Sequence, residues 1–158
     1  MDLVTAAQTG NIDDLDAGLK QGLDINLANT DQVTPLMAAA EAGQGEGVAW
    51  LLSHGAKLNQ TDPEGWTALM MCAGAGHLAI VTQLLEQGAD PNLQNTLGLS
   101  ALMMAAAKGH LAIVEALLAA GANLNLKDQN SWTALIWAAA EGQTAIVERI
   151  KQARQSAP

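Results

Sequence analysis

Phenylalanine and tyrosine are absent from the sequence, and aromatic residues make up only 3% of it. Apolar residues nevertheless account for 49% of the 158 positions, and most of these are small or aliphatic, with 31 alanines and 23 leucines. The length favours a single domain that is large enough to bury a core. Because the distance between packed helices depends on the side chains at the contact, an alanine-rich core predicts helices that approach one another closely.

Cysteine and long apolar segments are also scarce. The single cysteine, Cys72, excludes an internal disulfide and a cysteine-based metal cluster. The longest uninterrupted apolar runs, such as residues 101–107, are far shorter than the roughly 18 residues of a membrane-spanning helix, so no membrane span is expected. The first residues, Met1-Asp2-Leu3, lack the basic region of a signal or transit peptide, which predicts a cytoplasmic location.

Basic residues are few. Seven lysines and arginines stand against sixteen acidic residues, which gives a net charge of −9 and an isoelectric point near 4.5. Such a chain repels phosphate backbones, so nucleic acid is not expected as a partner. Twelve of the acidic residues but only two of the basic ones lie in residues 1–94. This acidic part either keeps the protein soluble or forms a docking surface for a basic partner.

The sequence repeats itself every 33 residues without a gap. Residues 62–94 and 95–127 are identical at 18 of 33 positions, which is far more than shared composition produces. The same step aligns hydroxyl residues, glycines and asparagines in four successive copies: Thr34, Thr67, Ser100 and Thr133; Gly43, Gly76, Gly109 and Gly142; Asn26, Asn59, Asn92 and Asn125. The chain is therefore an array of repeats, in which each unit buries its apolar face against its neighbours.

Each unit is expected to contain two short helices and a turn. Thr34 is a suitable N-cap for the first helix, and Pro35 follows at a position where the first turn of a helix tolerates proline. Gly43 and its equivalents are expected to end this helix in the left-handed conformation. A second, amphipathic helix follows, as in residues 78–85, and Gly88 closes it. The remaining turn-rich stretch is expected to project as a hairpin-like arm between units.

Three segments resemble the motifs of ankyrin repeats: Thr34-Pro35-Leu36, Gly76-His77-Leu78-Ala79-Ile80-Val81 and Leu84-Leu85-x-x-Gly88-Ala89-Asp90-x-Asn92. The resemblance covers nearly the whole chain and implies an all-α ankyrin-repeat solenoid of helix-turn-helix units with projecting hairpin-like arms. One domain, residues 1–158, then consists of units at about 1–28, 29–61, 62–94, 95–127 and 128–158. In the last unit Lys151 and Arg154 replace a leucine and a glycine, as a polar end cap requires.

The chain departs from the family pattern after the hydroxyl residue. Ankyrin repeats commonly have histidine after Thr-Pro-Leu, but Met37, Met70, Met103 and Ile136 stand at this position. A polar link between neighbouring arms is therefore expected to be missing. Because methionine fixes geometry less firmly than a hydrogen bond, the arms are expected to be looser.

A second departure lies in the second helix of the unit at residues 29–61. Gly45 and Gly47 replace apolar residues there, which removes both core volume and helix propensity. Trp50 follows three residues after Gly47 and so lies on the same helical face. Trp50 is expected either to fold over the gap that the glycines leave or to lie half exposed on the convex side.

No arrangement typical of catalysis occurs in the sequence. Ser100 lies in Gly98-Leu99-Ser100-Ala101-Leu102, which lacks the closing glycine of a nucleophile elbow, and it occupies the N-cap column. His77 and His110 recur 33 residues apart, as a structural role in a repeat predicts. Cys72 stands in a column of alanines and is expected to be a buried core residue. We therefore expect no enzyme activity, no cofactor and no metal site.

The resemblance implies that a partner protein binds the concave face, which the arms and the first helices form. One arm column on this face is apolar throughout: Val33, Trp66, Leu99 and Trp132. The family's variable positions add residues on the arms and first helices: Glu41, Glu64, Leu97, Lys108, Gln129, Asn130 and Glu141. Tryptophan is frequent at binding hot spots, although it also serves as a packing residue between arms. A further first-helix column, expected to be partly buried between units, holds Met71, Met104 and Trp137.

The predicted function is that of a non-catalytic protein-protein interaction module, which binds a partner protein on its concave face. The acidic charge suggests a basic partner, and neither nucleic acid nor a membrane is expected as a partner. A structural or assembly role, in which the apolar concave row mediates self-association, is the alternative. The chain is expected to be a monomer unless this row associates.

Overall fold

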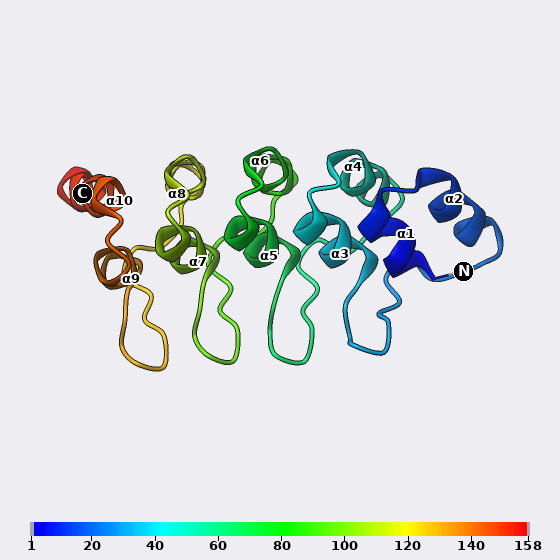
Figure 1. Ribbon diagram of the computed structural model, residues 1–158, viewed down its shortest axis with the longest axis horizontal. Coiled ribbons are helices and arrows are strands. Elements are labelled where there is room, and N and C mark those ends of the chain that lie inside the picture. The colour runs from blue at the N-terminus through cyan, green and yellow to red at the C-terminus, as the bar shows by residue number, and fades with distance from the viewer. Residues whose placement is uncertain (1, 158) are drawn as a thin grey trace.

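The computed structural model describes residues 2–157, which fold into two rows of α-helices with loops projecting from one side (Figure 1). The inner row consists of α1 (Leu3–Thr9), α3 (Pro35–Ala42), α5 (Ala68–Ala75), α7 (Ala101–Lys108) and α9 (Ala134–Ala140). The outer row consists of α2 (Ile12–Lys20), α4 (Gly45–Ser53), α6 (Leu78–Glu86), α8 (Leu111–Ala119) and α10 (Thr144–Ser156). The all-α fold is as predicted, and each predicted unit holds one pair of helices.

The inner helices begin and end at the residues that the repeat pattern singled out. The hydroxyl oxygens of Thr34, Thr67 and Ser100 accept hydrogen bonds from the backbone N–H three residues later, at 3.2, 3.2 and 3.3 Å. Gly43 follows α3 with a φ of 79°, in the left-handed region that glycine adopts without strain. The last inner helix differs from the prediction, because α9 ends at Ala140, before Gly142.

The core lies between the two rows. Alanines such as Ala39 and Ala106 have no exposed surface at the contacts between inner helices. These small side chains let the inner helices contact one another more extensively than the outer helices do. The outer helices contribute larger side chains that are completely buried, among them Val48, Leu51, Val81, Leu84, Val114 and Leu117.

Four loops connect each outer helix to the next inner helix and project together from the stack (Figure 1). We call residues 21–34, 54–67, 87–100 and 120–133 the first to fourth arms. One residue holds the turn in each arm, because its Oδ1 accepts hydrogen bonds from the backbone N–H two and four residues later. These residues are Asn29, Asp62, Asn95 and Asp128, with distances of 2.8 to 3.0 Å.

Backbone hydrogen bonds join the later arms to one another. The N–H of Thr96 in the third arm donates to the carbonyl of Glu64 in the second, at 2.8 Å. The N–H of Gln129 in the fourth arm donates to the carbonyl of Leu97 in the third, at 3.0 Å. Pro63 stands at the equivalent position of the second arm and has no N–H to donate. The first and second arms therefore lack this bond.

Methionine takes the place of the histidine that ankyrin repeats commonly have, and it packs into the core. Met37, Met70 and Met103 are each 1% exposed, whereas Ile136 in the last unit is 41% exposed. The histidine side chain is absent at these positions, but the prediction that neighbouring arms lack a polar link is wrong. Backbone bonds between the second, third and fourth arms provide polar links there instead.

A row of side chains ties each unit to the one before it. His77 Nε2 lies 2.9 Å from the carbonyl oxygen of Glu41, and His110 Nε2 lies 3.2 Å from that of Gly74. Because a carbonyl only accepts, the ring nitrogen donates in both bonds. Gln44 and Gln143 occupy the same column and donate in the same way, to the carbonyls of Gln8 and Ala107. The structural role predicted for the two histidines is confirmed.

The hypothesis that Trp50 fills the gap beside Gly45 and Gly47 is wrong. Its indole stacks on the imidazole of His54, with ring centroids 3.9 Å apart. A methyl group added at Gly45 would meet no atom within 4 Å, and one added at Gly47 would meet Gln44 first, at 3.4 Å. Trp50 turns toward the residue one helical turn further on because an aromatic partner lies there.

Within residues 2–157, no helix has the length and apolar character needed to cross a membrane.

Candidate binding groove

Three adjoining cavities form a groove along the inner helices and the arms. The first has a volume of about 460 Å³ and lies between the second arm, α5 and α7. The second, about 220 Å³, shares Met104 and Lys108 with the first. The third, about 190 Å³, shares Leu99 and Trp137 with the second. Because neighbouring cavities share walls, we describe them as one groove, which extends from α3 to the fourth arm.

Most of the residues predicted to bind a partner line this groove. They are Glu41, Glu64, Trp66, Leu97, Leu99, Lys108, Gln129, Asn130 and Glu141. Two predicted residues do not line it. Val33 lies half-buried on the first arm, and Trp132 packs edge-on against Trp137 with ring centroids 4.9 Å apart.

The floor of the groove consists partly of residues that the predicted site does not include. Met71, Met104 and Trp137 belong to one column of the inner helices and line the cavities. Ala38 is the fourth member of this column. The change from alanine through methionine to tryptophan, in helices that otherwise repeat closely, is a sequence signal that marks this position as variable and surface-facing.

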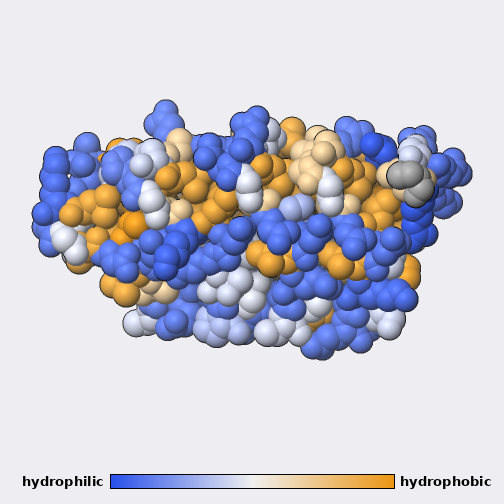
Figure 2. All heavy atoms as spheres, turned by 180° about the vertical axis from the view of Figure 1, so that it is seen from behind, coloured by the Kyte–Doolittle hydropathy of each residue, from blue (hydrophilic) through white to orange (hydrophobic). Residues whose placement is uncertain are grey.

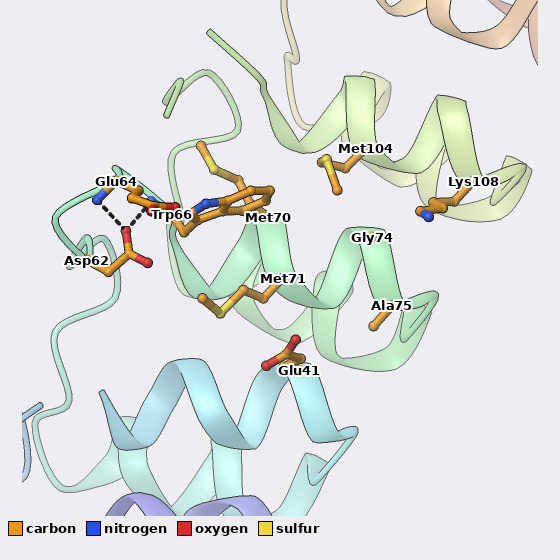
Figure 3. Close-up of a pocket in the computed structure, with 10 residues that line it drawn as sticks. All are labelled: Glu41, Asp62, Glu64, Trp66, Met70, Met71, Gly74, Ala75, Met104 and Lys108. Carbon is orange, nitrogen blue, oxygen red and sulfur yellow. Dashed lines mark hydrogen bonds between the residues drawn. The ribbon is translucent and has the colours of Figure 1, made fainter. Parts of the chain in front are cut away.

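Figure 3 shows how the first cavity is arranged. Asp62, Glu64 and Trp66 come from the second arm, Glu41 rises from α3, and Met104 and Lys108 lie across from them on α7. The turn of the arm sets the positions of Glu64 and Trp66, since both donate their backbone N–H to Oδ1 of Asp62, at 2.9 Å each.

The charged side chains of the groove form no ion pair with any residue that the structure describes. The ion pairs between residues 2–157 are Lys20–Asp16, Arg149–Glu115 and Lys151–Glu148, all of which lie outside it. Glu41, Glu64 and Lys108 are exposed. Their charges are therefore available to a bound molecule.

Apolar surface accompanies these charges. Leu97, at the tip of the third arm, is 52% exposed, and Trp66 and Leu99 are half-buried. Figure 2 shows one side of the molecule, on which apolar residues gather along the middle of the stack with hydrophilic residues above and below. A mixture of accessible apolar side chains with a charged border is typical of protein-binding surfaces.

Ser100 and Cys72, the potential nucleophiles considered in the sequence, have structural roles. Ser100 caps α7. Cys72 has no exposed surface, its Sγ donates to the carbonyl of Leu69 at 3.4 Å, and burial raises its pKa to about 12. A thiol with so high a pKa is not a nucleophile at neutral pH. Within residues 2–157, no group of three or more His, Cys, Asp or Glu side chains is placed to hold a metal ion.

Comparison with known proteins gives one family. The sequence model of the family described as Ankyrin repeats (3 copies) matches residues 3–95 and residues 75–156, and the two matches together span nearly the whole chain. A search of curated proteins gives no match.

Proposed function

Since the chain belongs to the ankyrin-repeat family, we propose that it is a non-catalytic module that binds a partner protein in the groove of its concave face. Ankyrin repeats are generally protein-protein interaction modules. The observation that carries the proposal is the continuity of the groove, in which accessible apolar residues lie beside charges that form no ion pair with another described residue. The acidic charge of the chain favours a basic partner. A cytoplasmic location, expected from the sequence, stays a prediction.

The proposal is tested by substituting an apolar residue of the groove and a matched residue outside it. Leu97 is 52% exposed on the third arm, and Leu78 is 41% exposed at the start of the outer helix α6. Leu97→Ser is expected to weaken capture of the partner from native lysate by about fivefold or more, because apolar contact area is lost. Leu78→Ser is expected to leave capture unchanged. Equal capture by both variants and the wild type would contradict the groove as the binding site.

The alternative function, self-association through the apolar concave row, predicts a different result. The mass in solution would then rise with protein concentration, and Leu99→Ser, which changes a residue of that row, would suppress the rise. Sedimentation equilibrium of the wild type at increasing concentrations distinguishes the two functions. A binding module of the kind we propose is expected to remain a monomer over this range.

A further inference from the structure

Asp62 in the second arm and Asp128 in the fourth occupy equivalent positions, but they differ in the hydrogen bonds that their Oδ2 atoms accept. In both, Oδ1 holds the turn of the arm. Oδ2 of Asp128 accepts a hydrogen bond from the indole Nε1–H of Trp137 on α9, at 2.9 Å. Met71 occupies the position of Trp137 in the earlier unit and has no N–H to donate. Among the described residues, none donates a hydrogen bond to Oδ2 of Asp62.

The open oxygen of Asp62 belongs to the largest cavity of the groove. Glu41 and Glu64 line the same cavity, so three carboxylates are present against one ammonium group, that of Lys108. None of these four side chains forms an ion pair with another described residue. The indole of Trp66 and the thioether of Met71 supply apolar wall between the carboxylates (Figure 3). The cavity therefore combines excess negative charge with a flat aromatic surface.

We propose that this cavity receives an arginine side chain from an extended segment of the partner protein. The guanidinium donates to Oδ2 of Asp62 the hydrogen bond that Trp137 donates to Asp128, and its remaining N–H groups face Glu41 and Glu64. Arginine fits better than lysine, because its planar group stacks on an indole such as that of Trp66 and carries five donors. The inference rests on the proposed function, since it names the chemistry of the partner at one place in the groove.

The experiment uses small probes whose binding is followed by NMR on the whole chain with labelled methionine methyl groups. The probes are N-acetylarginine amide, its neutral isostere N-acetylcitrulline amide, and N-acetyllysine amide. The arginine probe is expected to shift the methyl signals of Met71 and Met104 in a saturable way, with affinity at least about threefold higher than the lysine probe. Because citrulline lacks the charge, its probe is expected to cause no saturable shift at the same concentrations.

A matched pair of variants distinguishes the effect of the Asp62 carboxylate on probe binding from the effect of the net charge of the protein. Asp62→Asn retains the oxygen that holds the turn, as Asn29 and Asn95 do at equivalent positions, but replaces Oδ2 with an amide donor. We expect it to remain folded and to bind the arginine probe at least about fivefold more weakly. Asp90→Asn makes the same charge change in another turn, where Asn123 shows that asparagine is accepted, and should not affect binding.

The remaining outcomes overturn the inference. Equal shifts from the arginine and citrulline probes would show an apolar cavity without a cation site. Tighter binding of the lysine probe would show a site for an ammonium group. Equal weakening by Asp62→Asn and Asp90→Asn would show attraction by net charge alone. Each of these results leaves the proposed function standing, because that function is decided separately by the capture experiment with Leu97→Ser and Leu78→Ser.

Discussion

Trp137 donates the N–H of its indole to Oδ2 of Asp128, and this bond joins the last inner helix to the fourth arm. Asp128 is only 8% exposed, so its carboxylate depends on donors from the protein. Trp132 packs edge-on against the same indole. The pair therefore combines a charge-assisted hydrogen bond with aromatic packing at the end of the groove.

Trp137→Phe is expected to lower the free energy of unfolding by about 1–3 kcal/mol, because it leaves Oδ2 of Asp128 largely buried without a donor. Urea denaturation followed by circular dichroism measures the change. Trp66→Phe is the control, since no hydrogen bond of the Trp66 indole to a described residue is present. Equal losses for the two substitutions would show that the bond to Asp128 adds nothing to stability.

The arms contain two residues other than glycine in the left-handed region. Gln32 and Ser131 each have a φ of 63°, at positions where the second and third arms have Gly65 and Gly98. A side chain at Gly98 would place its Cβ 2.7 Å from the Cα of Asp128 in the next arm. Ser131 lies on the fourth arm, and within residues 2–157 no further arm follows it.

Ser131→Gly is therefore expected to raise the free energy of unfolding by about 0.5–1 kcal/mol, because it removes left-handed strain. The reverse change, Gly98→Ser, is expected to lower it by more than this amount, since strain and a backbone clash then add together. Thermal denaturation of both variants checks the two signs. Destabilisation by Ser131→Gly would contradict the assignment of strain to this turn.

Gly47 offers a second route to higher stability. It lies in the first turn of α4, and a methyl group there would meet neighbours at 3.4 to 3.8 Å, which is ordinary contact. Gly47→Ala is expected to stabilise the protein by about 0.5–1 kcal/mol through helix propensity and buried surface. Gly76→Ala is the opposite control, because Gly76 has a φ of 87° and its Cβ would lie 2.8 Å from the ring of His110. A loss of stability in both would disprove the expected room at Gly47.

His77 is expected to tolerate glutamine but not alanine. Gln44 and Gln143 make the same bond to the preceding unit from equivalent positions. His77→Gln should thus change stability by less than about 0.5 kcal/mol, whereas His77→Ala should cost about 1 kcal/mol through the lost hydrogen bond. Denaturant titration compares the three proteins. A loss for the glutamine variant as large as that for alanine would show that the ring packs in a way that an amide does not reproduce.

The buried thiol of Cys72 is expected to lower the free energy of unfolding at alkaline pH. The unfolded chain loses the thiol proton near pH 9, whereas the folded chain keeps it up to a pKa of about 12. Between these values the unfolded state binds fewer protons, so the free energy of unfolding falls as pH rises, by up to about 1.4 kcal/mol per pH unit. Cys72→Ala should remove this part of the slope, since alanine stands at the equivalent positions Ala39 and Ala105. Identical slopes from pH 9 to 11 would contradict the burial effect.

The 33-residue period predicted the features that every unit shares. N-caps such as Thr34, the left-handed Gly43 and the structural role of His77 follow from their recurrence, because stacked units place equivalent residues in equivalent surroundings. Most residues of the candidate groove were named from the resemblance to ankyrin repeats, which implies which positions are variable, and the period only carries those positions from one unit to the next.

Features of a single unit were not predictable in this way. Trp50 has an aromatic neighbour at His54 only in α4, and the open oxygen at Asp62 depends on Met71 standing where Trp137 stands in the last unit. Such contacts depend on the pairing of two variable positions in three dimensions. Aligning the repeats shows which positions vary, but it does not show which two of the variable side chains contact each other.

The proline in the second arm has a mechanical consequence for the groove. Pro63 removes the one backbone bond that would clamp the tips of the first and second arms together, so this junction resists bending less than the two that follow. Glu41 lies before the junction and Asp62 lies after it, and both line the first cavity of the groove. Flexing of the stack at this junction would therefore change the spacing of these carboxylates, and a ligand held between them would stiffen this junction.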